Sequence, residues 1–331
     1  MSDKTSFSVQ TKDELARIYP DKPCCRLAEL AAMVRMDGTV TLGTGSKMGL
    51  YVTTEYSAAA RKVYRLLKDC FDIEGEITIK RQTRLKRHTL YNIRVPAGDR
   101  VPEVLRQLGI LAEGEGRAIL PGIRKDLIRT QCCRRCYLRG AFLGGGSISS
   151  PDGNYHLEII TSHERLAASL AALINRFPEM QAKVSRRKQW YVVYMKDSQH
   201  IAAFLTVIGA HRALLEFEST KIMKDMKNQV NRLVNCETAN LGKTVDAAIR
   251  QIENIHLIDE TVGLDNISKP LADLARLRIE NPEINLKELG ELMQPPIGKS
   301  GINHRMRKLE ELAMEIRKRS QAGQDEIRLA K

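Results

Sequence analysis

Apolar and polar positions follow the same plan twice in the first two thirds of the chain. Each copy has an apolar helix, two short strand-like runs, an amphipathic helix, a second strand pair and a closing helix. The apolar helices are expected at about 24–36 and 132–144, and each ends at a glycine, which favours the left-handed conformation of a helix end. The copies span 22–112 and 131–210, so the pattern predicts an α+β domain at 22–215 built from a tandem αββαββα unit.

Individual residues support the repeat. Cys24-Cys25-Arg26 returns as Cys132-Cys133-Arg134, at an offset of 108 residues. Farther along, Phe71 matches Phe177 at an offset of 106, and Gly109 matches Gly209 at an offset of 100. Short insertions in the first copy explain the falling offset, so we interpret the match as an internal repeat rather than chance.

The strand signals stop after Gly209, and residues 216–320 are predicted to form an all-α domain. Helical periodicity continues to about residue 258 and is followed by a polar connector. Three further helices are expected to begin near Ser268, Asn285 and Ser300, the second with Glu288 completing a capping box. Residues 1–21 are expected to be an N-terminal extension, and residues 321–331 a frayed tail.

The amino-acid composition indicates a class of binding partner and a cellular compartment. The 331 residues are 43% hydrophobic, which is enough for a sizeable core and excludes a disordered protein. Lysine and arginine number 53 against 40 acids, so the net charge is +13 and favours double-stranded DNA as the partner, before a membrane. No apolar run approaches the ~20 residues of a membrane span, and the N-terminus is too polar for a signal peptide. With seven cysteines that do not resemble a secreted disulfide framework, we expect a cytoplasmic protein.

The first helix of each copy resembles the LAGLIDADG motif of homing endonucleases, in Leu30–Gly38 and Leu138–Gly146. The resemblance implies that the two helices pack together across a pseudo-twofold axis, with Ala32 against Gly140 and Met36 against Gly144. It also implies that one carboxylate at the base of each helix holds the divalent metals that cut DNA. Here those positions are Asp37 and Gly145, so the scaffold is expected without its metal site and without catalysis. Asp37 is then a helix-end and turn residue.

The cysteines offer a second candidate metal site. Cys24 and Cys25, together with Cys133 and Cys136, could supply four thiolates, because the two helix starts should be neighbours. An adjacent cysteine pair fits a tetrahedral zinc site poorly, however, and buried cysteine is a common small apolar residue. The sequence therefore predicts no metal and no cofactor.

Two basic hairpins carry a stronger signal. They contain no acid and occupy equivalent places in the two copies: Lys80, Arg81, Arg84, Lys86 and Arg87 in the first, and Lys183, Arg186, Arg187 and Lys188 in the second. A pseudo-twofold axis would place them symmetrically against the phosphates of a duplex. Charged hairpin tips are often merely solvated, and that alternative stays open. Trp190 and Tyr191 are expected in the core.

The last two helices are arranged like a helix-turn-helix at about 285–318. In the first, Leu286, Leu289, Leu292 and Met293 form an inward stripe, with Gly290 where the helices should cross closely. In the second, Ile302, Met306 and Leu309 share one face. The candidate DNA-binding residues there are Lys299, Ser300, Asn303, His304, Arg305, Arg307 and Lys308. The alternative is an ordinary basic amphipathic helix.

The whole chain resembles the WhiA family. The closest motifs are Cys-Cys-Arg-Arg at 132–135, residues 137–148, Asn240 with Lys243-Thr244-Val245, and the run 299–308. The resemblance implies a non-catalytic, nucleoid-associated transcriptional regulator of cell division and chromosome segregation, and of sporulation in sporulating species. It leaves open other division or regulatory proteins as partners, and the oligomeric state. The rival functions are an active site-specific endonuclease and a division adaptor whose DNA binding is incidental.

Overall fold

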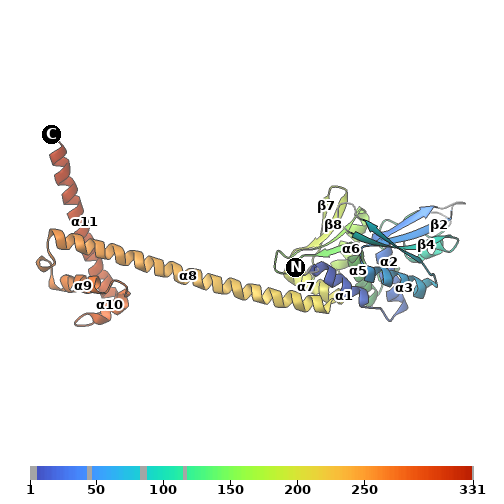
Figure 1. Cartoon of the computed structure of the whole chain (residues 1–331), viewed down its shortest axis with the longest axis horizontal. Coiled ribbons are helices and arrows are strands. Elements are labelled where there is room, and N and C mark those ends of the chain that lie inside the picture. The colour runs from blue at the N-terminus through green and yellow to red at the C-terminus, as the bar shows by residue number, and fades with distance from the viewer. Residues whose placement is uncertain (1–5, 43–46, 83–87, 115–117, 330–331) are drawn as a thin grey trace. The chain divides into compact units, whose positions relative to one another are not determined.

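The computed structural model describes residues 6–42, 47–82, 88–114 and 118–329, and it divides the chain into two compact units. The first comprises Met1–Asp225 and the second Met226–Lys331, so the division falls ten residues beyond the expected 215. Figure 1 shows the first unit in blue, green and yellow and the second in orange and red.

The first unit contains the predicted αββαββα unit twice. The elements of the first copy are α2 (Pro23–Asp37), β1 (Gly38–Leu42), β2 (Met48–Thr54), α3 (Ser57–Phe71), β3 (Glu76–Gln82), β4 (His88–Gly98) and α4 (Val101–Gln107). After a short 3₁₀ turn, η2 (Lys125–Ile128), the second copy consists of α5 (Gln131–Gly145), β5 (Gly146–Ile148), β6 (Leu157–Thr161), α6 (Glu164–Ile174), β7 (Lys183–Arg187), β8 (Trp190–Met195) and α7 (Ser198–Ile208). The α+β prediction is confirmed.

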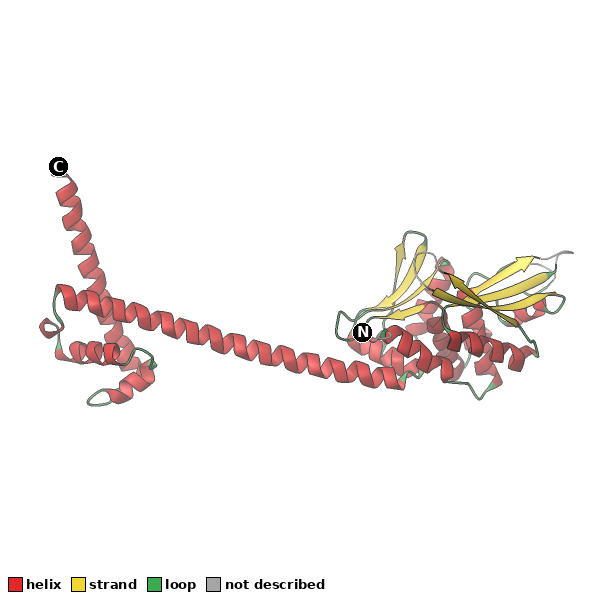
Figure 2. Ribbon diagram, in the orientation of Figure 1, coloured by secondary structure: helices red, strands yellow, loops and turns green. Residues whose placement is uncertain are grey.

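The two copies form matching antiparallel sheets. Their strand orders are β1-β2-β4-β3 and β5-β6-β8-β7. In each sheet the first two strands form one hairpin and the last two form another. The fourth strand pairs with the second, so the third strand lies at the outer edge. Figure 2 shows both sheets on one side of the unit and the helices on the other. The hydrophobic core lies between these layers.

Helices α2 and α5 pack against each other at the centre of the unit. A Cβ atom on Gly140 of α5 would lie 2.9 Å from the Cβ of Ala32 on α2, and one on Gly144 would lie 2.5 Å from the Cβ of Met36. Both pairs are those that the motif implied. Because a larger side chain at either glycine would push the helices apart, the small residues fix this close approach.

Three charged side chains are buried where α2, α3 and α5 meet. The carboxylate of Glu29 accepts hydrogen bonds from Arg139 Nε at 2.9 Å and Nη2 at 2.7 Å. It also pairs with Lys62, whose ammonium donates to the carbonyl of Leu15 at 2.9 Å. Arg139 donates further to the carbonyl of Ile208 at 3.4 Å. A single carboxylate thus joins both copies.

The expected N-terminal extension contains a helix, α1 (Phe7–Arg17). Phe7, Thr11 and Leu15 recur every four residues along one face and are buried, while Ser6 caps the helix by accepting from the amide of Val9. The segment is therefore part of the folded unit and not a loose leader to it.

The second unit is helical in the part that the structure describes. Helix α8 (His211–Thr261) crosses from the first unit into the second, and it is followed by the 3₁₀ turn η3 (Leu264–Asn266), α9 (Lys269–Glu280), α10 (Leu286–Leu292) and α11 (Lys299–Leu329). Ile255, Leu274, Leu289 and Ile302 are fully buried in its core. α11 continues through most of the segment that was expected to fray.

Two helix ends differ from expectation. Gly38 and Gly146 follow α2 and α5 with φ of −85° and −83°, so neither adopts the left-handed conformation. Each helix runs directly into a strand, and left-handed glycines follow the closing helices instead, where Gly109 and Gly209 have φ of 67° and 88°.

None of the helices described is both long and apolar enough to cross a membrane.

Candidate nucleic-acid interface

The basic hairpins occupy the same place in the two sheets, since β3 and β7 are the corresponding outer strands. The members that the structure describes are all exposed: Lys80, Arg81, Lys183, Arg186, Arg187 and Lys188. Arg84, Lys86 and Arg87 lie outside the described residues. Two of the exposed cations have local partners. Arg187 pairs with Glu158 at 3.1 Å, and the guanidinium of Arg186 lies 5.9 Å from the centre of the Tyr191 ring.

Trp190 lies beside the second basic cluster and not in the core, so that prediction is wrong. Its side chain is 45% exposed, and its backbone is the cross-strand partner of Arg187. The β7–β8 hairpin projects beyond the helices that cover the sheet, as the exposure of Val184 also indicates. Tyr191, one residue later, is half-buried against the core and donates a hydrogen bond to Glu164 at 3.3 Å.

The former nuclease positions meet at the ends of α2 and α5. A Cβ on Gly144 would lie 3.2 Å from Oδ2 of Asp37, so the two helix ends are direct neighbours. The resemblance to the LAGLIDADG motif implies the second carboxylate at Gly145, which has no side chain to offer a ligand. Metal-assisted phosphodiester cleavage of this kind needs ligands on both sides of the reacting phosphate.

A lysine that sequence analysis missed lies beside the remaining carboxylate. Lys12 of α1 is buried, with its Nζ 4.5 Å from the centre of the Tyr56 ring. Burial lowers the pKa of Lys12 to about 8, and the charges of Asp37 and Glu55 oppose the shift. Burial likewise raises the pKa of the Asp37 carboxyl to about 7, which Lys12 opposes. The buried face of α1 could have been predicted from the spacing of its apolar residues. The position of Lys12 beside Asp37 could not, because it depends on the tertiary structure.

Lys12→Met should raise the pKa of Asp37 above its value of about 7, because the charge that favours the carboxylate is removed. The pKa already exceeds the ordinary 3.8, so folding favours the protonated carboxyl and stability from this group is lost as pH rises from about 4 through 7. A pH titration of the Asp37 carboxyl carbon by NMR measures the shift. Lys287→Met, in the second unit, is the matched control. An unchanged Asp37 titration in Lys12→Met would show that the two groups are not coupled.

Arg35, two residues before Asp37 on α2, has a structural role. Its guanidinium donates to the carbonyls of Leu120 and Gly122, in the segment that joins the two copies. Burial lowers the pKa of Arg35. The cation therefore fastens the connecting segment to α2.

α10 begins with a capped turn and is joined to α11 by residues 293–298. The side chain of Asn285 accepts from the amide of Glu288 at 3.1 Å, and the side chain of Glu288 accepts from the amide of Asn285 at 3.2 Å, which is the expected capping box. A Cβ on Gly290 would clash with the carbonyl of Ile297 and lie 3.3 Å from Cγ1 of Ile302. Gly290 thus permits the close approach that its small size predicted.

The inward stripe of α10 is shorter than expected. Leu289 and Met293 are buried and Leu286 packs against the core, but Leu292 is 51% exposed. The helix ends at Leu292, and Met293 is extended with φ of −67° and ψ of 150°, which brings Met293 into the core in its place. Leu286 and Gly290 therefore shape the motif from inside the unit.

The first turns of α11 separate into two faces. Ile302, Met306 and Leu309 are buried, as their spacing predicted. The opposite face exposes Ser300, Asn303, His304, Arg307 and Lys308. Lys299 is exposed at the first residue of the helix, and Arg305 is half-buried. Lys299 also borders a cleft of about 260 Å³ that Lys243 and Thr244 of α8 line. Short polar side chains near the helix start, with cations around them, are the arrangement of a recognition helix.

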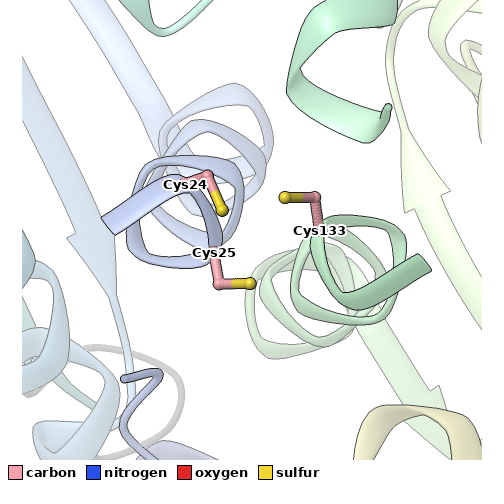
Figure 3. Close-up of side chains that lie close together, drawn as sticks. All are labelled: Cys24, Cys25 and Cys133. Atoms are coloured by element: carbon pink, nitrogen blue, oxygen red, sulfur yellow. The ribbon is translucent and has the colours of Figure 1, made fainter. Parts of the chain in front are cut away.

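The starts of α2 and α5 bring their cysteines together, as expected. The sulfur atoms of Cys24, Cys25 and Cys133 all lie within 4.8 Å of one another (Figure 3). All seven cysteines are unpaired.

Comparison with known proteins accounts for both units. The family models for the WhiA N-terminal LAGLIDADG-like domain, the WhiA LAGLIDADG-like domain and the WhiA C-terminal HTH domain match residues 23–111, 134–227 and 230–313. The chain belongs to the WhiA family. The matched helix-turn-helix region thus includes α10 with Gly290 and the two-faced start of α11.

Relatives in this family are similar over nearly their whole length. The protein named probable cell division protein WhiA from Desulfitobacterium hafniense strain Y51 is 55% identical over 315 residues, covering 95% of this chain and 98% of the relative. Its namesake from Desulforamulus reducens is 51% identical over 312 residues, covering 94% and 96%. The crystal structure of full-length DUF199/WhiA from Thermatoga maritima has a TM-score of 0.56 at 25% identity, covering 94% of this chain and 99% of that one.

Proposed function

We propose that this chain is a non-catalytic, DNA-binding regulator that acts in bacterial cell division. The observation that carries the proposal is the exposed polar and basic face of α11, which lies opposite the buried Ile302, Met306 and Leu309. The family model of a helix-turn-helix over residues 230–313 supports it, as do the names of the relatives. Double-stranded DNA is the proposed partner, and the net charge of +13 favours it.

In this proposal some exposed side chains of α11 contact bases and others contact phosphates. Asn303 and His304 lie about one turn into the helix, and Arg307 lies one turn farther along the same face. Asparagine pairs with adenine and arginine with guanine through two hydrogen bonds each. The remaining exposed cations, Lys299 and Lys308, would hold phosphates and set the register of the helix on the duplex.

Asn303→Ala and Arg307→Ala should each relax the preference at particular base pairs, by about 1–3 kcal/mol per lost bidentate contact. Neither side chain belongs to the buried face, so the unit should stay folded. Binding selection on randomised DNA measures the preference of each variant. Lys299→Ala should weaken all sequences about equally, and Glu311→Ala, exposed farther along α11, is the control. An unchanged preferred sequence in both test variants would move base recognition to the first unit.

The first unit is proposed to contact DNA through its basic hairpins without cutting it. The motif supplies one carboxylate, Asp37, and the buried ammonium of Lys12 interacts with it. A divalent cation would have to displace or tolerate this lysine, and it would still lack a ligand from Gly145. An active endonuclease, the rival function, needs a ligand set that these residues do not supply.

No magnesium- or manganese-dependent cutting of supercoiled plasmid is expected from the full chain. Asp37→Asn should bind DNA like the unchanged chain, because Asp37 is a half-buried acid and the proposed phosphate contacts come from exposed cations. Agarose gels of nicked and linear plasmid, with a binding assay in parallel, test both statements. Cutting that Asp37→Asn abolishes would establish the endonuclease instead.

The finer biological role is part of the same proposal. Promoter recognition by the second unit would make the chain a transcriptional regulator on the nucleoid, with effects on chromosome segregation and, in sporulating species, on sporulation. The division-adaptor alternative predicts no discrete chromosomal sites. Mapping chromosomal occupancy of the full chain, and then of a chain lacking residues 260–331, distinguishes the two.

A further inference from the structure

Five of the seven cysteines lie at the starts of α2 and α5, a concentration that DNA binding does not explain. Cys24 and Cys25 are the second and third residues of α2, and Cys132 and Cys133 hold the same places in α5. The close packing of the two helices, fixed by Gly140 and Gly144, makes their starts neighbours. The repeat has therefore placed two equivalent thiol pairs at one location.

Three of these thiols converge on one point. Figure 3 shows the sulfur atoms of Cys24 and Cys25 directed from α2 toward Cys133 on α5, and all three lie within 4.8 Å of one another. Cys25 and Cys133 are each 4% exposed, whereas Cys24 is open to solvent. The objection that adjacent cysteines cannot share a ligand set does not hold here, because side chains in the first turn lean toward the helix start and both reach the same gap.

The other two cysteines lie near Cys25 but also have partners outside the three-sulfur cluster. The sulfur of Cys132 lies 3.2 Å from Oγ1 of Thr130, and that of Cys136 accepts a hydrogen bond from Arg139 at 3.2 Å. Among the described residues, Cys24, Cys25 and Cys133 are the cysteines whose sulfurs all lie within 4.8 Å of one another.

The spacing of these sulfurs suits a soft metal ion. With zinc–sulfur bonds of about 2.3 Å, two thiolates on one zinc lie about 3.8 Å apart, so side-chain shifts of about 1 Å would close the site. Three thiolates and one divalent cation sum to a charge of −1. Two helix starts, each equivalent to roughly half a positive charge, face that charge and balance it.

We propose that Cys24, Cys25 and Cys133 form a three-thiolate site for zinc or another soft divalent cation of the same d¹⁰ class, with the fourth position open to water beside Cys24. Sulfur ligands exclude magnesium and calcium, which take oxygen. The ion clamps the starts of the two central helices and so stabilises the first unit. The site is separate from the former nuclease positions, which lie at the opposite ends of the same helices.

Metal titration of the full chain tests the proposal. The protein is reduced, stripped with a chelator, and titrated with Zn²⁺ against a chromophoric competitor, and with Cd²⁺ followed by the thiolate-to-metal absorption in the ultraviolet. We expect one equivalent of either ion and a melting temperature that rises with zinc concentration. Cys24→Ala and Cys133→Ala should each lose that equivalent. Because Cys24 is exposed, its substitution should leave the fold intact, as circular dichroism would verify.

The matched control is Cys236→Ala, an exposed cysteine on α8, which should keep the full equivalent. Absence of stoichiometric binding by the unchanged chain would overturn the proposal, as would binding that survives both Cys24→Ala and Cys133→Ala. Thiol counting in denaturant adds a further check. Fewer than seven free thiols in the chain as purified, before any reductant is added, would indicate a disulfide in place of a metal site, and would also overturn it.

Discussion

Glu29→Gln is expected to lower the free energy of unfolding of the first unit by about 3–5 kcal/mol, the range for removing one member of a buried ion pair. The substitution keeps the shape of the side chain but leaves Lys62 and Arg139 buried without a counter-charge. Burial already lowers the pKa of Lys62, and the Glu29 carboxylate opposes that shift. Without the carboxylate, both cations must be desolvated with no ion pair in return.

Urea unfolding followed by tryptophan fluorescence is the suitable measurement. Trp190 is the single tryptophan of the chain and lies in the first unit, so its signal is not mixed with unfolding of the second. Glu76→Gln is the matched control, because Glu76 pairs with Arg94 at 3.5 Å on the surface. Exposed pairs contribute about 0–1 kcal/mol. A cost for Glu29→Gln no larger than that of Glu76→Gln would show that the buried network adds nothing to stability.

The alternation of polar and apolar positions was sufficient to predict the architecture of the first unit. A strand such as β6 has Leu157, Ile159 and Thr161 buried on one face, so its period is visible in the sequence. The tandem repeat then doubled the evidence, because each element of one copy could be checked against the other. Packing of α2 on α5 was implied by the resemblance to the LAGLIDADG motif, which places Gly140 against Ala32 and Gly144 against Met36.

The misses share a physical cause, which is that local pattern does not say where an element ends or what covers it. Trp190 belongs to a strand whose later residues are buried, yet the hairpin extends beyond the covering helices at that point. Leu292 has the spacing of a core residue, but α10 ends there. Gly38 ends a helix as expected, although the chain continues at once into β1 and not through a left-handed turn.

The candidate sites were predictable to different degrees. The exposed face of α11 depends on one helix only, so the spacing of Ile302, Met306 and Leu309 defined it. The lysine beside Asp37 comes from α1, and only the tertiary structure brings Lys12 to that carboxylate. The thiol cluster is intermediate, because the repeat indicated neighbouring helix starts while the direction of the sulfurs required the structure.

Replacing Lys80, Arg81, Arg186 and Arg187 together with glutamine should flatten the salt dependence of DNA binding. Each phosphate contact contributes about 0.9 to the slope of log K against log salt, so four lost contacts would change it by up to about 3–4. Arg187 already pairs with Glu158 at 3.1 Å, and breaking that pair on binding would reduce its share. We therefore expect the slope to change by about 2.7, which is the contribution of three contacts.

The control must carry the same change in net charge at another place. Arg61, Lys68, Lys125 and Arg176 are exposed on the helical side of the first unit, and Lys68 pairs with Glu74 at 2.6 Å much as Arg187 pairs with Glu158. Changing these four to glutamine should leave the slope unchanged, since the duplex would not release counterions there. Equal flattening in both variants would mean that net charge alone draws the chain to DNA. An unchanged slope in the hairpin variant would assign the hairpins to solubility or to a protein partner, because cations in contact with phosphates cannot be removed without a change in salt dependence.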